Sequence, residues 1–210
     1  MKNWQSVVKI LESFYAASGR RFPWRYTRDP YRVFVAEVML QKTPAVRCVD
    51  AYEKFVRAFP SCLDVAKADE TTISHFFEEL GLRKRGRWIR EACERVVMAY
   101  GGKFPASVED LVTLKGCGTY TARAVYIAIT GVGKLPVDVN VRRVLTRLYG
   151  SWKTEFEELV VSKESFYGLL DVASEFCKRD TPSCGDCPLR ECCETSENIE
   201  KVNLSKLFLF

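Results

Sequence analysis

LKGCGTYTA, residues 114–122, is the stretch of sequence that decides the fold. Its pattern predicts a helix end, a tight glycine turn and the start of a second helix, because glycine permits positive φ and close backbone approach at Gly116 and Gly118. The first N–H groups of the second helix would lack intrahelical partners, and such a helix end can bind a phosphate whatever the neighbouring base. An ordinary helical hairpin would satisfy the same two glycines equally well.

Helical periodicity continues on both sides of this hairpin. Apolar residues recur at i, i+3, i+4 and i+7 from Trp4 to Tyr15, from Ala122 to Ile129 and from Val141 to Leu148. Gly and Pro residues separate these stretches at intervals that suit helices of about 10 to 15 residues, and strand-like alternation is scarce. The sequence therefore predicts an all-α protein.

Composition and charge restrict the function classes. The 210 residues suffice for one large domain or two small ones, and 32 Lys and Arg against 27 Asp and Glu leave a net charge of +5. Glu37 interrupts the longest apolar run, Val33 to Leu40, so we expect an intracellular protein without a membrane partner. Basic residues cluster at 20–28, 83–90 and 142–147. Such clusters are the footprint of a nucleic-acid binder, although a lone cluster is more often a solvated face.

Nine cysteines, five of them within residues 177–193, point to metal ligation in a reducing compartment. The spacing Cys177-x6-Cys184-x2-Cys187-x5-Cys193 lets four thiolates wrap one compact centre, with Cys192 as an alternative to Cys193. Spacing alone does not separate zinc from an iron–sulfur cluster. The remaining cysteines are expected to pack in the core.

Two carboxylates stand out in helical context. Asp138, in LPVDVNVRRV (135–144), precedes an apolar-periodic helix and is a favoured N-cap. Glu37 has only apolar or neutral neighbours at i±3 and i±4 on its own helix, so its pKa should rise and it could act as an acid. The alternative for Glu37 is an ion pair with another helix.

The cysteine spacing, the hairpin and the Asp138 segment together resemble the endonuclease III superfamily of DNA glycosylases, from about Phe22 to Cys193. The resemblance implies two helical domains with a DNA- and base-binding cleft between them. A six-helix domain would span residues 23–132 and contain the hairpin. A discontinuous domain, 1–22 plus 133–210, would hold a [4Fe–4S] cluster at 177–193, on Cys177, Cys184, Cys187 and Cys193.

The resemblance also implies roles for the site residues. Asp138 matches the essential carboxylate, which stabilises the sugar cation or activates water. Tyr120 stands where endonuclease III has a lysine that forms a Schiff base, and since a phenol cannot form that imine, we expect a monofunctional enzyme. Glu37, Tyr120 and Asn140 would position the base. Lys115 stands where the family usually has Pro, and Cys117 where it usually has an aliphatic residue.

Further residues are predicted to contact DNA. Gln41 matches the loop residue placed near the gap left by a flipped nucleotide, and Lys115 is interpreted as a phosphate contact. The full predicted set is Gly116, Gly118, Thr119, Lys115, Gln41, Lys42, Asn140 and Arg142. The expected partner is double-stranded DNA with a mismatched or damaged base, bound by a monomer.

The segments PWR (23–25) and EVMLQ (37–41) resemble both MutY-type adenine glycosylases and G/T mismatch-specific thymine glycosylases. MutY enzymes carry a further C-terminal domain, and 17 residues after Cys193 are too few for one. We therefore expect base excision of thymine or uracil opposite guanine. The alternatives are an adenine glycosylase lacking that domain, a bifunctional endonuclease III-like lyase, or a non-catalytic DNA-structure binder. The apolar tail Leu204–Phe210 could bind a sliding clamp or dock on its own domain.

Overall fold

The computed structural model describes residues 3–78, 81 and 83–196. The chain forms two compact units. The first, here called the hairpin unit, is Arg21–Gly131. The second, here called the cysteine unit, combines Met1–Arg20 with Val132–Phe210.

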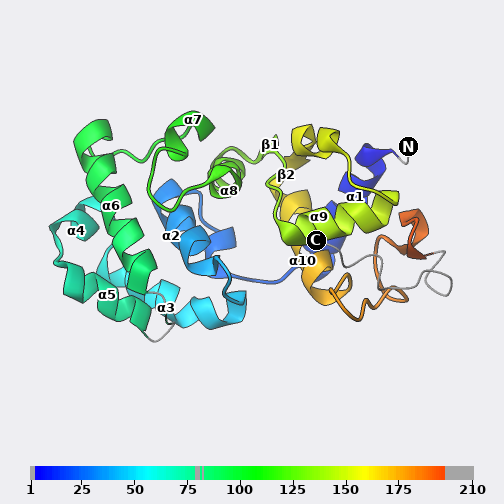
Figure 1. Ribbon diagram of the computed structural model, residues 1–210, viewed down its shortest axis with the longest axis horizontal. Helices are drawn as coiled ribbons and strands as arrows, with labels where there is room; N and C mark the ends of the chain where they lie inside the picture. Colours follow the sequence, from blue (N-terminus) through cyan, green and yellow to red (C-terminus); the bar gives the residue numbers. More distant parts are fainter. Residues whose placement is uncertain (1–2, 79–80, 82, 197–210) are drawn as a thin grey trace. The chain divides into compact units, whose positions relative to one another are not determined.

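All the regular secondary structure of the hairpin unit within its described residues is helical, and Figure 1 shows α4 and α5 packed against α6. Its elements are η1 (Pro23–Arg25), α2 (Pro30–Leu40), α3 (Ala45–Ala58), α4 (Cys62–Lys67), α5 (Glu70–Glu78), α6 (Arg83–Tyr100), α7 (Val108–Leu111) and α8 (Thr119–Thr130). Side-chain caps fix several helix starts, such as the Asp29 carboxylate that accepts from the Tyr31 N–H at the start of α2.

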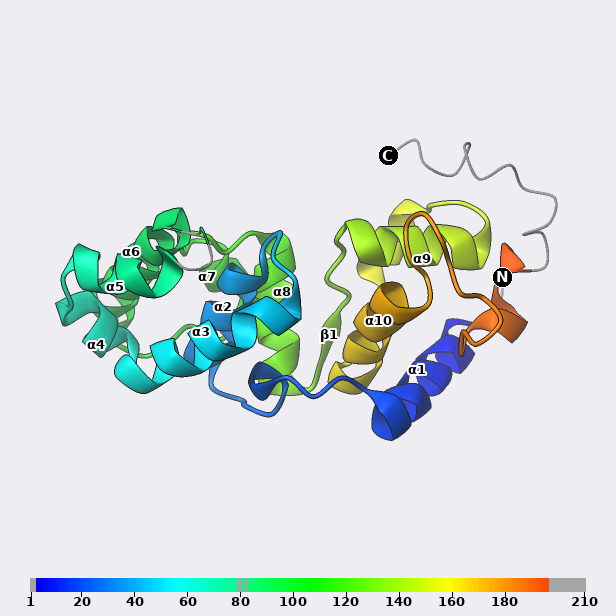
Figure 2. The same cartoon turned by 90° about the horizontal axis from the view of Figure 1, so that it is seen from below.

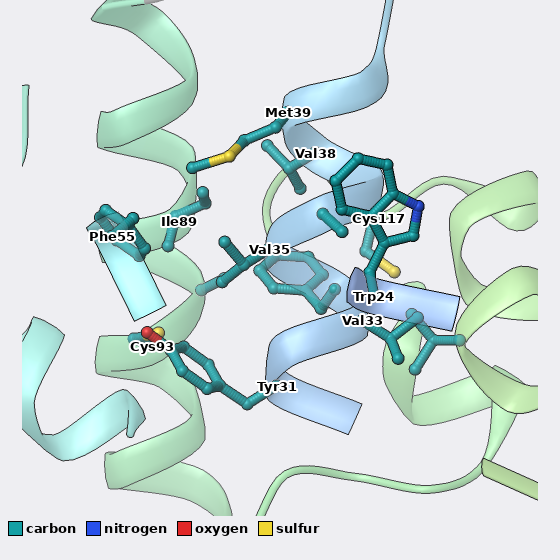
Figure 3. Close-up of a cluster of buried hydrophobic side chains, with 14 of the residues drawn as sticks. Trp24, Tyr31, Val33, Val35, Val38, Met39, Phe55, Ile89, Cys93 and Cys117 are labelled. Carbon is teal, nitrogen blue, oxygen red and sulfur yellow. The ribbon is translucent and has the colours of Figure 1, made fainter. Parts of the chain in front are cut away.

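Helix α2 lies at the centre of the core of the hairpin unit. Its side chains from Val33 to Met39 are all buried, on every face of the helix. Figure 3 shows Trp24 and Cys117 on one side of α2 and Phe55 and Ile89 on the other. Because α2 also packs along α8, this buried helix ties the hairpin to the rest of the unit.

The cysteine unit is built around α10, which packs against both α1 and α9 (Figure 2). Its elements are α1 (Trp4–Ser18), β1 (Val132–Lys134), α9 (Val139–Tyr149), η2 (Thr154–Glu158), β2 (Val160–Ser162), α10 (Lys163–Glu175) and η3 (Arg190–Cys192). Gly168 lets α10 approach α1 closely, because a Cβ at this position would lie 2.4 Å from the Leu11 carbonyl oxygen.

The expected helical architecture is confirmed, and the three periodic stretches correspond to α1, α8 and α9. The strictly all-α prediction omitted one antiparallel pair, in which Gly133 of β1 lies opposite Val161 of β2. Three-residue strands are too short to produce an alternation signal. None of the helices in the described ranges is long and apolar enough to cross a membrane.

Candidate active site

The glycine turn leads into the N-terminus of α8. Gly116 has φ +79°, and a Cβ there would lie 3.3 Å from the Trp88 Cβ, so both backbone and packing require glycine. Of the two glycines at which the sequence permits positive φ, only Gly116 adopts it. Gly118 is extended (φ −77°, ψ 178°) and serves as the N-cap of α8, where no side chain among the described residues caps the helix. A helix N-terminus without a side-chain cap, here bordering a hollow lined by Gly118, Tyr120 and Thr121, is the kind of backbone site that binds an anion.

The turn borders an open hollow of about 500 Å³ in the hairpin unit. Gln41 closes one edge by donating from Nε2 to the Gly116 carbonyl oxygen at 2.9 Å. Lys115 and Thr119 are solvent-exposed beside the turn. The residues that line the hollow are Gln41, Trp88, Leu114, Gly116, Cys117, Gly118, Tyr120 and Thr121.

Glu37 lies on the buried helix α2, with only 8% of its surface exposed. It lies close enough to Cys117 to affect the thiol: burial, with the Glu37 charge as a second cause, raises the pKa of Cys117 to about 12. Tyr120, in the first turn of α8, is half-buried and lines the hollow. The hairpin unit thus holds a carboxylate and a phenol around the glycine turn.

Asp138 is the N-cap of α9, which confirms the capping interpretation. Its Oδ1 accepts from the Asn140 N–H at 2.9 Å and from the Val141 N–H at 2.8 Å. Its Oδ2 accepts from the Asn140 side-chain amide at 2.8 Å. Three donors therefore hold a half-buried carboxylate in one orientation, and its charge is favourable at the positive end of the helix dipole.

Arg143 extends this arrangement, which sequence reasoning missed. Its Nη1 donates to the Asn140 Oδ1 at 2.9 Å, while its Nε donates to the Cys177 carbonyl oxygen at 2.8 Å. Burial lowers the pKa of Arg143, but a guanidinium remains charged. Asp138, Asn140, Arg143 and the backbone of the first predicted metal ligand thus form one hydrogen-bonded chain.

The structure places Arg142, a predicted DNA contact, within its own unit. The guanidinium lies over the Trp152 ring, 4.2 Å from its centroid, and 3.9 Å from a Glu157 carboxylate oxygen. Stacking of this kind is worth about 0.5–1 kcal/mol at an exposed site.

Four cysteines line a single cavity in the cysteine unit, namely Cys177, Cys184, Cys187 and Cys193. The pKa of Cys187 is raised to about 11, mainly by burial and in smaller part by the charges of the three other thiols. Cys192 does not line the cavity; its thiol donates to the Leu189 carbonyl oxygen at 3.3 Å. The buried Arg147 guanidinium lies 3.5 Å from the Cys177 sulfur.

The donor set is chemically suited to a metal cluster. Thiolates are the ligands of iron–sulfur clusters, and Arg147 supplies a compensating positive charge. Within residues 3–78, 81 and 83–196, no three Cys, His, Asp or Glu side chains converge on a point that would hold a single metal ion. Arg147 also donates to the Lys178 and Arg179 carbonyl oxygens at 2.6 and 2.8 Å, so it fixes the path of the loop that carries the cysteines.

Sequence reasoning missed Trp88, Arg143 and Arg147 as parts of these sites. The arginines were noticed only as a basic cluster, because their acceptors are carbonyl groups about 30 residues away. The four scattered cysteines, Cys48, Cys62, Cys93 and Cys117, are buried as predicted. The predicted clamp-binding tail, Leu204–Phe210, lies outside the described residues.

The chain is similar to known DNA repair proteins. Residues 35–163 match the HhH-GPD superfamily base excision DNA repair proteins. A thymine-DNA glycosylase of Aeropyrum pernix is 31% identical over 88% of this chain and 91% of its own. A thymine/uracil-DNA glycosylase of Methanothermobacter thermautotrophicus is 28% identical over 90% and 93%.

A solved structure of a thermostable thymine-DNA glycosylase superposes with a TM-score of 0.81 at 28% identity, covering 92% of this chain and 96% of the other. The resemblance stated from the sequence is thereby confirmed. The helical fold, the glycine hairpin and a match over more than half of the chain together show that this protein belongs to the HhH-GPD superfamily of base excision DNA repair proteins.

Proposed function

We propose that the protein is a monofunctional DNA glycosylase that removes thymine or uracil mispaired with guanine. The observation that carries this proposal is the Asp138 carboxylate, which three donors hold rigidly at the start of α9. Its support is the similarity to proteins named thymine-DNA and thymine/uracil-DNA glycosylases over most of their length.

The target base must leave the duplex before its glycosidic bond is accessible. Unstacking costs a few kcal/mol and is cheapest at a mispair, which contributes to selectivity. The α8 N-terminus, which has no side-chain cap, binds a backbone phosphate, with the exposed Lys115 and Thr119 as neighbouring contacts. Gln41 and Lys42, on the loop beside the hairpin, contact the gap that the base leaves.

Bond cleavage then requires stabilisation of positive charge on the sugar. The C1′–N bond breaks, its electron pair leaves with the base, and Asp138 stabilises the oxocarbenium-like deoxyribose. The oxygen of a water molecule then bonds to C1′, and a proton of this water passes to the departing base. Asn140 orients the carboxylate through its amide, while Glu37 and Tyr120 position the base.

Tyr120 restricts the chemistry to hydrolysis. A lyase needs an amine that forms a Schiff base with C1′, and a phenol cannot form one. We therefore assign base release without strand cleavage. Borohydride should trap no covalent adduct with DNA, and trapping would instead favour the bifunctional alternative.

We further propose that Cys177, Cys184, Cys187 and Cys193 hold a [4Fe–4S] cluster, because these four thiols line one cavity beside a buried guanidinium. When bound, the cluster cross-links the loop and thereby stabilises it. Iron and sulfide analysis together with visible absorbance tests the assignment. Zinc without iron would contradict it.

Base release from a panel of duplexes tests the proposed activity. Purified protein is incubated with G·T, G·U, A·G and adenine opposite oxidised guanine, and abasic sites are revealed by alkali. Release of thymine or uracil supports the proposal. Release of adenine would establish the MutY-type alternative, and tight mismatch binding without any release would establish a DNA-structure binder.

A further inference from the structure

The loop Gln41–Thr43 between α2 and α3 has an unusual backbone. Lys42 has φ +57° and is the one non-glycine residue with positive φ within the described ranges. A side chain in this region costs roughly 1–2 kcal/mol, and such strain persists only where the surroundings impose it. The contacts that impose this shape are therefore informative.

Hydrogen bonds to two other elements, the glycine turn and α6, hold the loop. On one side, Gln41 donates to the Gly116 carbonyl oxygen of the hairpin. On the other, Arg85 of α6 uses Nη1 to donate both to the Met39 carbonyl oxygen at 2.7 Å and to the Thr43 hydroxyl at 3.0 Å. The Met39 carbonyl is one of the last of α2, which have no intrahelical partner. This carbonyl accepts from Arg85 and also from the Cys48 thiol at 3.4 Å, and Arg85 in addition ties the helix end to Thr43.

Arg85 differs from its neighbours in the basic cluster of α6. Arg87 is 67% exposed and pairs with Glu91 on the same helix, and Arg83 is 74% exposed and pairs with Glu78. Arg85 is half-buried, and burial lowers its pKa. Both groups that accept from Arg85 are neutral. Arg85 therefore constrains the geometry of the loop through hydrogen bonds and does not serve as an exposed surface charge.

We infer that Arg85 is a positioning residue that holds the Gln41–Thr43 loop in its strained conformation before DNA binds, so that the loop enters the gap without a further ordering cost. The inference rests on the proposed function of the loop. Preorganisation of this kind accelerates extrusion because the entropy of ordering the loop has already been lost during folding.

The test compares Arg85→Met with Arg87→Met, which removes the same charge two positions along the same helix. The rate of base release is measured with saturating enzyme, and a 2-aminopurine beside the target base reports unstacking. We expect Arg85→Met to slow both signals at least tenfold. Arg87→Met should weaken only the salt-dependent affinity for DNA, because its side chain does not touch the loop.

Two conservative variants test these hydrogen bonds further. Arg85→Lys keeps the charge but places a single ammonium on a shorter side chain, so we expect partial recovery of the rate. Thr43→Val removes, at nearly constant volume, the hydroxyl that accepts from Arg85 at 3.0 Å and donates to the Gln41 carbonyl oxygen at 3.4 Å. It should reproduce part of the defect even if Arg85→Met folds poorly. Equal slowing by Arg85→Met and Arg87→Met, or full activity of both Arg85→Met and Thr43→Val, would overturn the inference.

Hydrogen exchange distinguishes failure of this inference from failure of the proposed function. The Thr43 N–H donates to the Leu40 carbonyl oxygen at 3.1 Å, so its exchange reports the closed loop without any substrate. We expect clearly faster exchange at this amide in Arg85→Met but not in Arg87→Met. Unchanged exchange would contradict the positioning role of Arg85 even if the enzyme proved active. Faster exchange would support that role even if no duplex in the panel released a base.

Discussion

Replacement of Asp138 by Asn separates the capping and catalytic roles of this carboxylate. Asn is as good an N-cap as Asp, so its side-chain oxygen can still accept from the Asn140 and Val141 N–H groups. The lost contact is the one from the Asn140 amide to Oδ2, where the variant presents a donor to a donor. That contact is worth about 1 kcal/mol, and the lost charge at the helix N-terminus about 0.3–1 kcal/mol.

The expected destabilisation of Asp138→Asn is therefore about 1–2 kcal/mol, or roughly 2–8 °C in Tm for a chain of this size. Base release should fall far more. Removal of a single preorganised group that stabilises transition-state charge typically costs about 100- to 1,000-fold in rate. We expect at least this loss, with affinity for the mismatched duplex retained because the phosphate contacts are unchanged.

The assay measures single-turnover release from a G·T or G·U duplex by alkaline cleavage, alongside a thermal melt and a binding titration. Asp29→Asn is the matched control, since Asp29 also caps a helix, α2, through a backbone N–H. It should change Tm by a similar small amount and leave the rate unchanged. Near-normal turnover by Asp138→Asn would refute the catalytic role.

Three further predictions follow from the structure. Tyr120→Lys places an amine in the first turn of α8, and we expect borohydride to trap a protein–DNA adduct that the wild type does not form. Cys193→Ser should lower iron content and visible absorbance, whereas Cys192→Ser should not, because only Cys193 lines the cavity; equal loss would contradict the ligand set. Gly116→Ala should lower the free energy of unfolding by about 1–2 kcal/mol, because its φ is +79° and Trp88 crowds it. Gly118→Ala, with open space and an ordinary φ, should stay within about 1 kcal/mol of the wild type in denaturant titrations.

Local signals in the sequence predicted the local structure well. The i, i+3, i+4 spacing identified α1, α8 and α9, and Asp138 was placed correctly as a helix cap. The cysteine spacing predicted one ligand set, and these four cysteines line one cavity, although within the described residues no three of them converge on a single metal position. These features depend on residues close together in the chain, so periodicity and spacing report them directly.

Tertiary packing decided what each polar group near the site touches. The sequence grouped Arg85 with exposed arginines and Arg143 with Arg142, yet Arg85 closes the α2 loop and Arg143 joins Asn140 to Cys177. It also treated Gly116 and Gly118 alike, although only Gly116 is pressed against Trp88. A guanidinium takes whichever carbonyl the fold brings near, and a glycine is needed only where another segment or a positive φ demands it. The carbonyl acceptors of these arginines and the Trp88 side chain beside Gly116 are distant in the sequence, so only the folded chain determines these contacts.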